Sequence, residues 1–398
     1  MRIAMMTDVY KPHVSGITNY ISLNKEYIEK AGHQVFIFTF GDLDYADDED
    51  RVIRSPGLPL TDTGYYLSFR YSRRAKALLQ TMDLVHVHHP FLSGRLALNY
   101  CRPLRIPIVF TNHTRYDLYA QAYLPLLPDG LSDTILQTYL PTFCKAVDLV
   151  ISPSAGMGEV LKKLGVSIPI EIIPNGVDLS LFRAACHDCR QDFGFGKKDI
   201  LFIYSGRLGP EKNLDFLIRA FAGAAETIKN VHLLIVGGGP EEEPLKQLAG
   251  QTGASSRIHF IGMQPYEELP RYLSMCNVFI TASVTEVHPL SIIEAMATGL
   301  PVLGIHSVGV GDIVEDGVTG LLSSQDQAAF AAHLTRLCMD NNLRLRLGEN
   351  AQKISGKYAI EQTTQVMLKR YDRLMTEFAP HRRGLGYYIR NLVEKIRT

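Results

Sequence analysis

Two carboxylates, Glu286 and Glu294, lie on either side of the expected start of a helix, with seven residues between them. An apolar run that reads as a buried strand precedes them, and apolar residues at helical spacing follow. Pro289 suits the first helical position, and the residue before it is a poor cap, so the N–H groups of Leu290 and Ser291 are expected to lack side-chain partners. Free N–H groups and the positive end of the helix dipole favour a bound phosphate.

The two carboxylates indicate what accompanies that phosphate. Because an ionised carboxylate only accepts hydrogen bonds, its natural partners are the hydroxyls of a sugar or a ribose. A molecule with hydroxyls at both ends and phosphate between them is a nucleotide-sugar. The alternative, for two glutamates alone, is an ordinary amphipathic helix with solvated side chains, since charged residues mostly lie exposed.

A second group of charges follows an expected strand at 200–204. Arg207 and Lys212 flank the loop SGRLGPEKN, and Asn213 is a good N-cap for a helix expected at 214–224. Two cations at the carboxyl end of a strand fit a diphosphate, arginine through bidentate contacts and lysine as a point charge. Without the position at the strand end, two surface charges would not indicate a phosphate site.

These segments resemble the retaining glycosyltransferases of family four, which have the GT-B fold. The run EVHPLSIIEAMATGLPV is similar to the family's E-x7-E signature, with the A-M-A-x-G-x-P-V tail in register, and GRLGPEKN is similar to its G-R-L-x-x-E-K-N segment. The family usually has a Gly-Phe-Gly-like segment where this chain has Val287-His288-Pro289. The run PNGVD, at 174–178, also resembles the family, where it precedes the linker between the domains.

The resemblance and the charge pattern together imply roles for single residues. Arg207, Lys212 and the helix start are expected to neutralise the departing diphosphate, so that neither a divalent metal nor another cofactor is required. Glu294 is expected to hold the ribose, and Glu286 the hydroxyls of the transferred sugar. The expected catalytic residues are His113, Glu286, Arg207 and Lys212, and the expected donor-binding residues are Gly16, Met263, His288, Pro289, Leu290, Ser291 and Glu294.

The first half of the chain begins with a βαβ pattern. A strand at 2–6, a helix at about 18–31 and a strand at 35–40 place Gly16 at the first strand-to-helix turn. A glycine there lets a ligand approach the backbone closely. In the resembled family this glycine faces the donor phosphates or the acceptor.

Histidines end two further strands of this half. A strand expected at 107–111 leads to His113, and ligands of open α/β sheets bind beyond such ends. The family carries a histidine of this kind beside the transferred sugar, and a packing or capping histidine is the alternative. In the strand expected at 83–89, alternation sends His86 and His88 to one face and His89 to the other, which favours a strand end at the ligand site over a metal site. The expected acceptor residues are His89 and Tyr116, with Tyr119 and Tyr123 along the same path.

Composition bounds the class of protein. The 398-residue chain is long enough for two domains, and its 41 basic and 41 acidic residues give no global attraction to nucleic acid. No run is apolar and long enough for a signal peptide or a membrane span, so we expect a cytoplasmic protein.

The acidic run 42–50 is expected to be a solvated loop rather than a metal-binding D-x-D. Cys186 and Cys189 are expected to be incidental thiols or a local disulfide rather than half a zinc site.

Strands and helices alternate in both halves. This predicts an α/β protein with two doubly wound, Rossmann-like domains facing a cleft, the GT-B architecture. We expect an acceptor-binding domain at 1–180, a linker near 180–196 and a nucleotide-sugar-binding domain at 197–375. The resemblance implies that a C-terminal helix within 376–398 crosses back to the first domain, and a membrane-facing tail is the alternative.

The acceptor is indicated by a basic segment, 69–80, which is expected to be helical. Such a helix can lie on an anionic membrane surface, and a solvated surface helix is the alternative. The segment resembles the membrane-binding helix of phosphatidylinositol mannosyltransferase-like enzymes, and TNHTRYDLY resembles part of diacylglycerol α-glucosyltransferases. We therefore expect a retaining hexosyltransferase that moves glucose from a UDP-sugar to a hydroxyl of a lipid such as diacylglycerol, peripherally on the inner face of the membrane. A nucleotide-sugar 2-epimerase, a transferase with a small soluble acceptor and a non-catalytic nucleotide-binding module are the alternatives.

Overall fold

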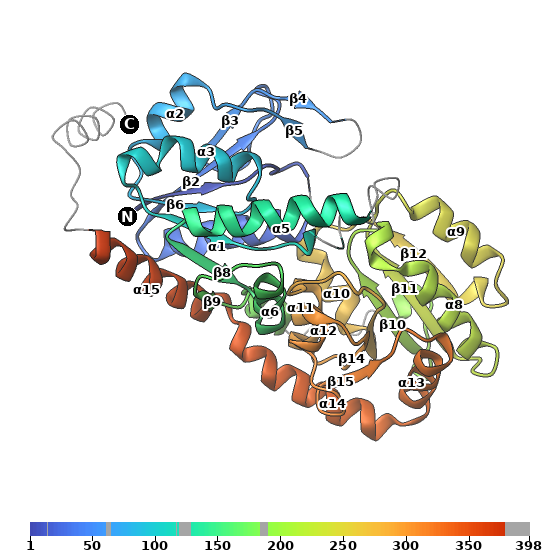
Figure 1. The fold of residues 1–398 in the computed structure, drawn as a ribbon. Coiled ribbons are helices and arrows are strands. Elements are labelled where there is room, and N and C mark those ends of the chain that lie inside the picture. Colours follow the sequence, from blue (N-terminus) through green and yellow to red (C-terminus); the bar gives the residue numbers. More distant parts are fainter. Residues whose placement is uncertain (14, 61–64, 117, 119–128, 184–189, 379–398) are drawn as a thin grey trace. The chain divides into compact units, whose positions relative to one another are not determined.

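The computed structural model describes residues 1–13, 15–60, 65–116, 118, 129–183 and 190–378. Contacts divide the chain into two compact units, each built on its own open sheet (Figure 1). The first unit comprises residues 1–113, 130–176 and the described chain from Ile360 onward. The second comprises Val177–Ala359 and the few described residues between 114 and 129.

The sheet of the first unit has seven parallel strands in the order β3-β2-β1-β6-β7-β8-β9, and β4 and β5 form a separate antiparallel pair. The strands are β1 (Arg2–Met6), β2 (Gln34–Phe40), β3 (Val52–Ser55), β4 (Leu58–Pro59), β5 (Tyr66–Leu67), β6 (Leu84–Val87), β7 (Ile108–Thr111), β8 (Leu149–Ser152) and β9 (Ile170–Ile172). The helices are α1 (Gly16–Lys30), α2 (Arg73–Leu79), α3 (Leu92–Tyr100), α5 (Asp129–Ala146), α6 (Ala155–Lys163) and α15 (Ile360–Phe378).

The sheet of the second unit has six parallel strands in the order β12-β11-β10-β13-β14-β15. The strands are β10 (Ile200–Ser205), β11 (Val231–Val236), β12 (Ile258–Gly262), β13 (Val278–Thr281), β14 (Val302–Ile305) and β15 (Gly320–Ser323). The helices are α7 (Leu179–Arg183), α8 (Leu214–Ala225), α9 (Glu242–Gly250), α10 (Leu269–Ser274), α11 (Leu290–Ala297), α12 (Val308–Gly311), α13 (Gln327–Met339) and α14 (Asn341–Ser355).

The central strands are mostly apolar on both faces because helices cover both faces of each sheet. In β10, Leu201 and Ile203 enter one core while Phe202 and Tyr204 enter the core on the opposite face, as alternation along a strand requires. Helices α8 and α13 cover the face of Phe202, and α10 and α11 cover the other face. The β10 sequence therefore specifies a strand in the middle of a layered α/β unit.

Each sheet reverses its strand order at one place. In the first unit the reversal lies between β1 and β6, and in the second it lies between β10 and β13. Loops that leave the carboxyl ends of strands on either side of such a reversal diverge, and this is where doubly wound proteins bind ligands. The expected donor charges follow β10 and β13, and the expected histidines follow β6 and β7.

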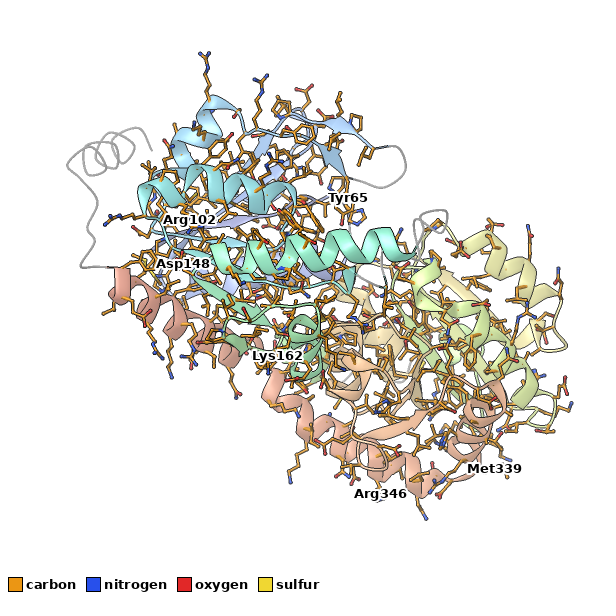
Figure 2. The ribbon with its side chains drawn as sticks, in the orientation of Figure 1. Tyr65, Arg102, Asp148, Lys162, Met339 and Arg346 are labelled. Atoms are coloured by element: carbon orange, nitrogen blue, oxygen red, sulfur yellow. The ribbon has the colours of Figure 1, made fainter. Side chains whose placement is uncertain are left out.

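Aspartates fix the beginnings of two strands in the first unit. Asp148 accepts a hydrogen bond from the N–H of Ile108 at 2.8 Å, and Asp83 accepts one from Arg2 N–H at 2.8 Å. Burial raises the pKa of Asp148, although the Ile108 N–H and the charge of Arg102 oppose the rise. Asp148 and Arg102 are both labelled in Figure 2. These bonds fix the start of β7 and β1, whose far ends carry candidate site residues.

The unit boundaries differ from those expected. The second unit begins at Val177 instead of 197, and the chain returns to the first unit at Ile360 instead of 376. The reason for the early return is α15, whose Met367, Tyr371 and Leu374 belong to the core of the first unit. The expected helix within 376–398 falls almost wholly outside the described residues, as do Cys186 and Cys189.

Two surface segments also differ from expectation. The helix expected at 69–80 is only α2, because Ser72 caps it through Ala75 N–H and Tyr71 is buried with its ring stacked on Phe40 at 5.0 Å. The acidic run is not simply solvated, since Glu49 accepts hydrogen bonds from Tyr10 at 3.0 Å and from Ser22 at 2.7 Å. The run thereby holds the loop between β1 and α1.

Candidate active site

The loops that follow β10 and β13 are joined directly in the second unit. Ser283 and Thr285 donate hydrogen bonds to the backbone carbonyl of Glu211, at 3.4 and 3.2 Å. Asn213 donates from Nδ2 to the carbonyl of Ala282 at 3.1 Å. The two loops that carry the expected donor charges therefore form one structure at the carboxyl edge of the sheet.

Asn213 corrects one expectation. It occupies the N-cap position of α8, but its side chain makes no capping bond and reaches across to the other loop. Its backbone has φ of 54°, a left-handed conformation that asparagine tolerates better than most residues. Asparagine is thus suited to this position for its backbone and for the cross-loop bond.

Lys212 forms an ion pair with Glu286. Their Nζ and Oε1 atoms lie 2.7 Å apart, and the side chains are 21% and 18% exposed. Burial, the largest single influence, lowers the pKa of Lys212, but Glu286 together with Tyr204 and Glu211 outweighs it, so the net pKa is raised. The lysine therefore stays charged at any physiological pH, half-enclosed and beside a carboxylate that can also accept from hydroxyls.

Arg207 lies on the same loop and pairs with Glu211 at 3.2 Å. Tyr204, the penultimate residue of β10, donates from its hydroxyl to the carbonyl of Arg207 at 3.0 Å. Since Glu211 is almost fully buried, the arginine is attached to the body of the unit at both its backbone and its guanidinium. Both expected diphosphate cations are thus held in place by acidic partners.

Helix α11 begins one residue later than expected. Pro289 is the N-cap, with ψ of 119°, and Leu290 is the first helical residue. No side chain caps this end, so the expected uncapped N–H groups are confirmed. His288 before it is buried with its ring against Tyr358, and burial together with Lys357 lowers its pKa to about 3, so it is neutral.

Glu294 lies inside α11 and is almost fully buried. It accepts a hydrogen bond from the hydroxyl of Tyr266 at 2.9 Å. Burial raises the pKa of Glu294 to about 7, although the Tyr266 bond opposes the rise. The raised pKa means that few groups of the protein stabilise the ionised carboxylate. Hydroxyl groups of a ligand that donate hydrogen bonds to it would favour this ionised form.

The turns after β11 and β12 complete this edge. Gly237 has φ of 137°, and a Cβ there would collide with the carbonyl of Gly206 in the loop after β10. Its N–H donates to the carbonyl of Gly262 at 2.9 Å. The next residue, Met263, an expected donor-binding residue, is 62% exposed, so this turn presents an apolar side chain at the surface.

In the first unit, His86 of β6, His88 after β6 and His113 after β7 form a cluster that is mostly buried. His86 uses both ring nitrogens, Nδ1 with the Tyr371 hydroxyl at 2.6 Å and Nε2 with the Thr111 hydroxyl at 2.7 Å. His88 lies against it with ring centroids 4.3 Å apart, and its Nδ1 is 3.0 Å from Nε2 of His113. The expected alternation is confirmed, because His86 and His88 lie against each other while His89 instead contacts Thr7 and Asp8.

His89 is bonded to the end of β1. Its Nδ1 accepts from the backbone N–H of Asp8 at 3.2 Å and lies 3.1 Å from the Thr7 hydroxyl. Its ring meets Tyr65 edge-on at 6.2 Å, and Figure 2 labels Tyr65 beside the β4–β5 pair. Tyr116 is half-buried, while Tyr119 and Tyr123 lie outside the described residues.

Gly16 is the first residue of α1 instead of part of a turn. Ser15 caps this helix through a capping box with Thr18. A Cβ added at Gly16 would meet no atom within 4 Å. The protein itself therefore does not need a glycine at this position.

Two family models match the chain. Residues 14–181 match the model described as Glycosyltransferase Family 4, and residues 188–354 match the one described as Glycosyl transferases group 1. An alpha-monoglucosyldiacylglycerol synthase of Streptococcus pneumoniae is 30% identical over 337 residues, 81% of this chain and 75% of the relative. The chain belongs to glycosyltransferase family four.

One further relative resembles this family-four glycosyltransferase in sequence, and two solved structures resemble it in fold. An alpha-monoglucosyldiacylglycerol synthase of Acholeplasma laidlawii is 27% identical over 377 residues, 91% of this chain and 94% of the relative. A sucrose-phosphate synthase from Thermosynechococcus elongatus superposes with a TM-score of 0.79 at 22% identity, covering 94% of this chain and 99% of its own. Anabaena HepE in complex with UDP and glucose superposes with a TM-score of 0.74 at 20% identity, covering 94% of this chain and 100% of its own. The GT-B fold expected from the sequence is confirmed.

In this glycosyltransferase the expected residues fall into two groups. Arg207, Lys212, Glu286 and the start of α11 share the edge of the second sheet at its reversal point, while His113 and His89 share that of the first. Among the described residues, no cluster of three or more histidine, cysteine or acidic side chains is arranged to hold a metal ion.

Two partners were missed by sequence reasoning. Tyr266, which holds Glu294, lies 28 positions away in a turn after β12. His88 was noted only as part of a strand end, yet it is the hydrogen-bond partner of His113. Spacing carries no signal for either contact, because both depend on which strands are neighbours in the sheet.

Proposed function

We propose that this glycosyltransferase moves glucose from UDP-glucose to a hydroxyl of a lipid such as diacylglycerol, with retention of the α configuration. The relatives in Streptococcus pneumoniae and Acholeplasma laidlawii are named as synthases of alpha-monoglucosyldiacylglycerol, and the Anabaena structure holds UDP and glucose. The observation that carries the proposal is the Lys212–Glu286 pair beside the uncapped start of α11.

The donor's diphosphate is met by fixed positive charge. Lys212 and Arg207 supply full charges, and the free N–H groups at Leu290 and Ser291 supply partial ones. Glu286 accepts hydrogen bonds from the hydroxyls of the sugar, and Glu294 accepts them from the hydroxyls of the ribose. Because Arg207 and Lys212 are already held by protein partners, they stabilise the departing diphosphate with little rearrangement.

The reaction then needs no covalent intermediate with the protein. The bond between C1 of the hexose and the diphosphate oxygen breaks, and its electron pair stays on the diphosphate. The acceptor oxygen bonds to C1 on the same face, and the acceptor's proton passes to the departing phosphate oxygen. Trapping of a glucosyl-enzyme would contradict this same-face route.

The activity is tested with the full-length protein, UDP-glucose and vesicles that contain diacylglycerol. We expect release of UDP and a glucosylated lipid with an α linkage, read from the anomeric proton coupling by NMR. A β linkage would overturn retention, and interconversion of UDP-sugars without acceptor would favour the 2-epimerase. The same assay is run with D-inositol 3-phosphate as a small soluble acceptor in place of diacylglycerol. This compound appears in the name of a Nocardia farcinica relative.

Metal independence is tested in the same assay. Since the proposed charge stabilisation comes from protein groups, we expect enzyme treated with EDTA to keep its full rate. A rate that disappears with EDTA and returns with magnesium would show that the diphosphate charge is met by an ion.

A peripheral membrane site is proposed on the first unit. Leu58 of β4 and Phe69 are 72% and 69% exposed, and the exposed Arg73 and Arg74 of α2 follow Phe69 closely in the chain. Apolar side chains beside arginines suit an anionic bilayer surface, whose negative potential attracts basic residues. In the described ranges, no helix has both the length and the apolar character that crossing a bilayer requires.

The membrane site is tested by co-sedimentation. The Arg73→Glu, Arg74→Glu double variant should lose binding to anionic vesicles and keep its UDP affinity. A matched double charge reversal at Lys162 and Lys163 of α6 should bind as the unmodified protein does. Equal binding of all three proteins to anionic and neutral vesicles would refute the site.

A further inference from the structure

The hydrogen bond between His88 and His113 determines what His113 can do. Nδ1 of His88 lies 3.0 Å from Nε2 of His113. A neutral imidazole has one N–H and one lone pair, so one ring donates and the other accepts. Burial is the main cause of the lowered pKa of both rings, and the neighbouring histidines lower both further, so both are neutral at physiological pH.

His86 cannot take part in this choice. Both of its nitrogens are engaged, by the Tyr371 and Thr111 hydroxyls. It nevertheless restricts His88, because the two rings are in contact, with centroids 4.3 Å apart and planes tilted by 38°. Tyr20 packs against His113 with ring centroids 4.7 Å apart, so His113 is held from the other side. Neither ring of the pair is free to turn away.

The second nitrogen of His88 decides the direction of the bond. This atom, Nε2, is buried and has no hydrogen-bond partner within the described residues. If His113 donated to His88, the proton of His88 would sit on this nitrogen as a buried, unpaired N–H. If His88 donates from Nδ1, only a lone pair is left unpaired. Orphaned donors are rarer in folded proteins than under-satisfied acceptors, so the second arrangement is favoured.

We propose that His88 is a positioning residue that donates its Nδ1–H to Nε2 of His113, so that His113 carries its own proton on Nδ1 and offers a hydrogen-bond donor to the transferred sugar. The assignment of the sugar to His113 rests on the proposed function, whereas the tautomer does not. With its Nε2 lone pair occupied, His113 cannot accept the acceptor's proton. The proton therefore leaves on the phosphate oxygen, as the same-face route requires.

The tautomer is measured directly in the full-length protein by NMR of ring-¹⁵N-labelled histidine. Two-bond proton–nitrogen correlations distinguish a ring protonated at Nδ1 from one protonated at Nε2, and a His113→Gln variant assigns the signals. We expect His113 to be protonated at Nδ1. Protonation at Nε2 would overturn the proposal, whether or not any sugar transfer is detected.

Two substitutions at His88 separate positioning from packing. In His88→Asn the amide Nδ2 takes the place of Nδ1 and can still donate, so the His113 signals and the rate should be close to those of the unmodified protein. In His88→Leu the donor is lost, so His113 should shift toward Nε2 protonation and kcat should fall roughly ten- to hundredfold, with UDP affinity unchanged. Leucine and asparagine variants with the same tautomer and the same rate would refute the role.

Failure of the two proposals can be told apart. If UDP-glucose is not a donor, no variant shows transfer, yet the NMR signals still report the tautomer. Should His88→Leu not fold, the unmodified protein and His88→Asn still decide the question, because the predicted Nδ1 protonation is read in both.

Discussion

The ionisation of Glu294 is set by its surroundings, and in the proposed ribose site it would link nucleotide binding to pH. Burial raises its pKa to about 7, from an ordinary value of 4.5. Ribose hydroxyls that donate to this group stabilise only its ionised form. Below pH 7 the free enzyme holds a proton there, which binding must displace.

We therefore expect UDP affinity to weaken as the pH falls below about 7, by up to roughly tenfold per pH unit. Calorimetry in buffers of different ionisation enthalpy should show a proton released on binding near pH 6.5. The Glu294→Gln variant supplies the control, since UDP itself titrates but glutamine does not. The same pH dependence in both proteins would mean that Glu294 stays out of the nucleotide site.

Lys212 and Lys246 are a matched pair for testing the diphosphate site. Both are paired with glutamates in the second unit, Lys212 with Glu286 and Lys246 with Glu242 and Glu243 at 2.9 Å each. Only the partner of Lys212, Glu286, lies in the loop that leads into α11. Lys212→Met should lower kcat/KM about 10²- to 10³-fold, the usual effect of losing one stabilising charge in a transition state.

Lys246→Met should leave the rate unchanged, because exposed ion pairs contribute little. Steady-state kinetics of the two variants, with melting temperatures as a check on folding, give the comparison. Losses of similar size in both would remove Lys212 from the proposed chemistry.

At the level of elements, two glycines near the ends of strands and helices differ in why the position has a glycine. Gly237 is required by the fold, since its φ is 137° and a Cβ would collide with Gly206. Gly16, at the start of α1, has open space around it. If Gly16 is kept for a ligand, substitution should affect activity without affecting stability.

Gly16→Ala should therefore melt at the temperature of the unmodified protein and lose at least about tenfold in kcat/KM, because a small displacement of substrate is costly. Gly237→Ala should melt at a clearly lower temperature. Thermal denaturation and initial rates measure both. A fully active Gly16→Ala protein would show that no ligand reaches that backbone.

Most elements that surround the site follow from the sequence, because long apolar runs and helical spacing are strong signals. The β10 and β13 strands and the helices after them lie where the pattern predicts them, and α11 differs by one residue at Pro289. The end of a short surface helix is harder to predict. In α2 the buried Tyr71 and the Ser72 cap shorten the helix, and the packing of Tyr71 on Phe40 is tertiary.

The site itself divides in the same way. Charged residues that follow strands, such as Lys212 and Glu286, can be predicted because strand ends of a doubly wound sheet bind ligands. Their supporting contacts cannot, since Tyr266 with Glu294 and His88 with His113 join separate loops. The return of the chain at Ile360 was also predicted too late, because α15 is amphipathic in either unit and only its packing assigns it.

For the whole molecule, the proposed donor-binding charges Arg207, Lys212 and Glu294 belong to the second unit, whereas His88 and His113 belong to the first. UDP alone should therefore protect backbone amides of the second unit, chiefly those in 205–213 and 282–294, from hydrogen exchange. Peptides that contain His88 and His113 should change little with UDP. Exchange mass spectrometry measures this, and protection centred on the first unit would contradict the assignment of the donor.

The late arrival of α15 in the first unit has a consequence for how the protein is made. Everything in that unit except α15 has been synthesised once residue 176 has left the ribosome, yet Met367, Tyr371 and Leu374 are still missing from its core. At typical elongation rates the remaining stretch takes on the order of tens of seconds. During that interval the nascent chain exposes the apolar core residues that α15 will cover and the His86 ring that Tyr371 will bond. A ribosome-stalled chain ending before Ile360 should accordingly bind chaperones through its earliest-made half.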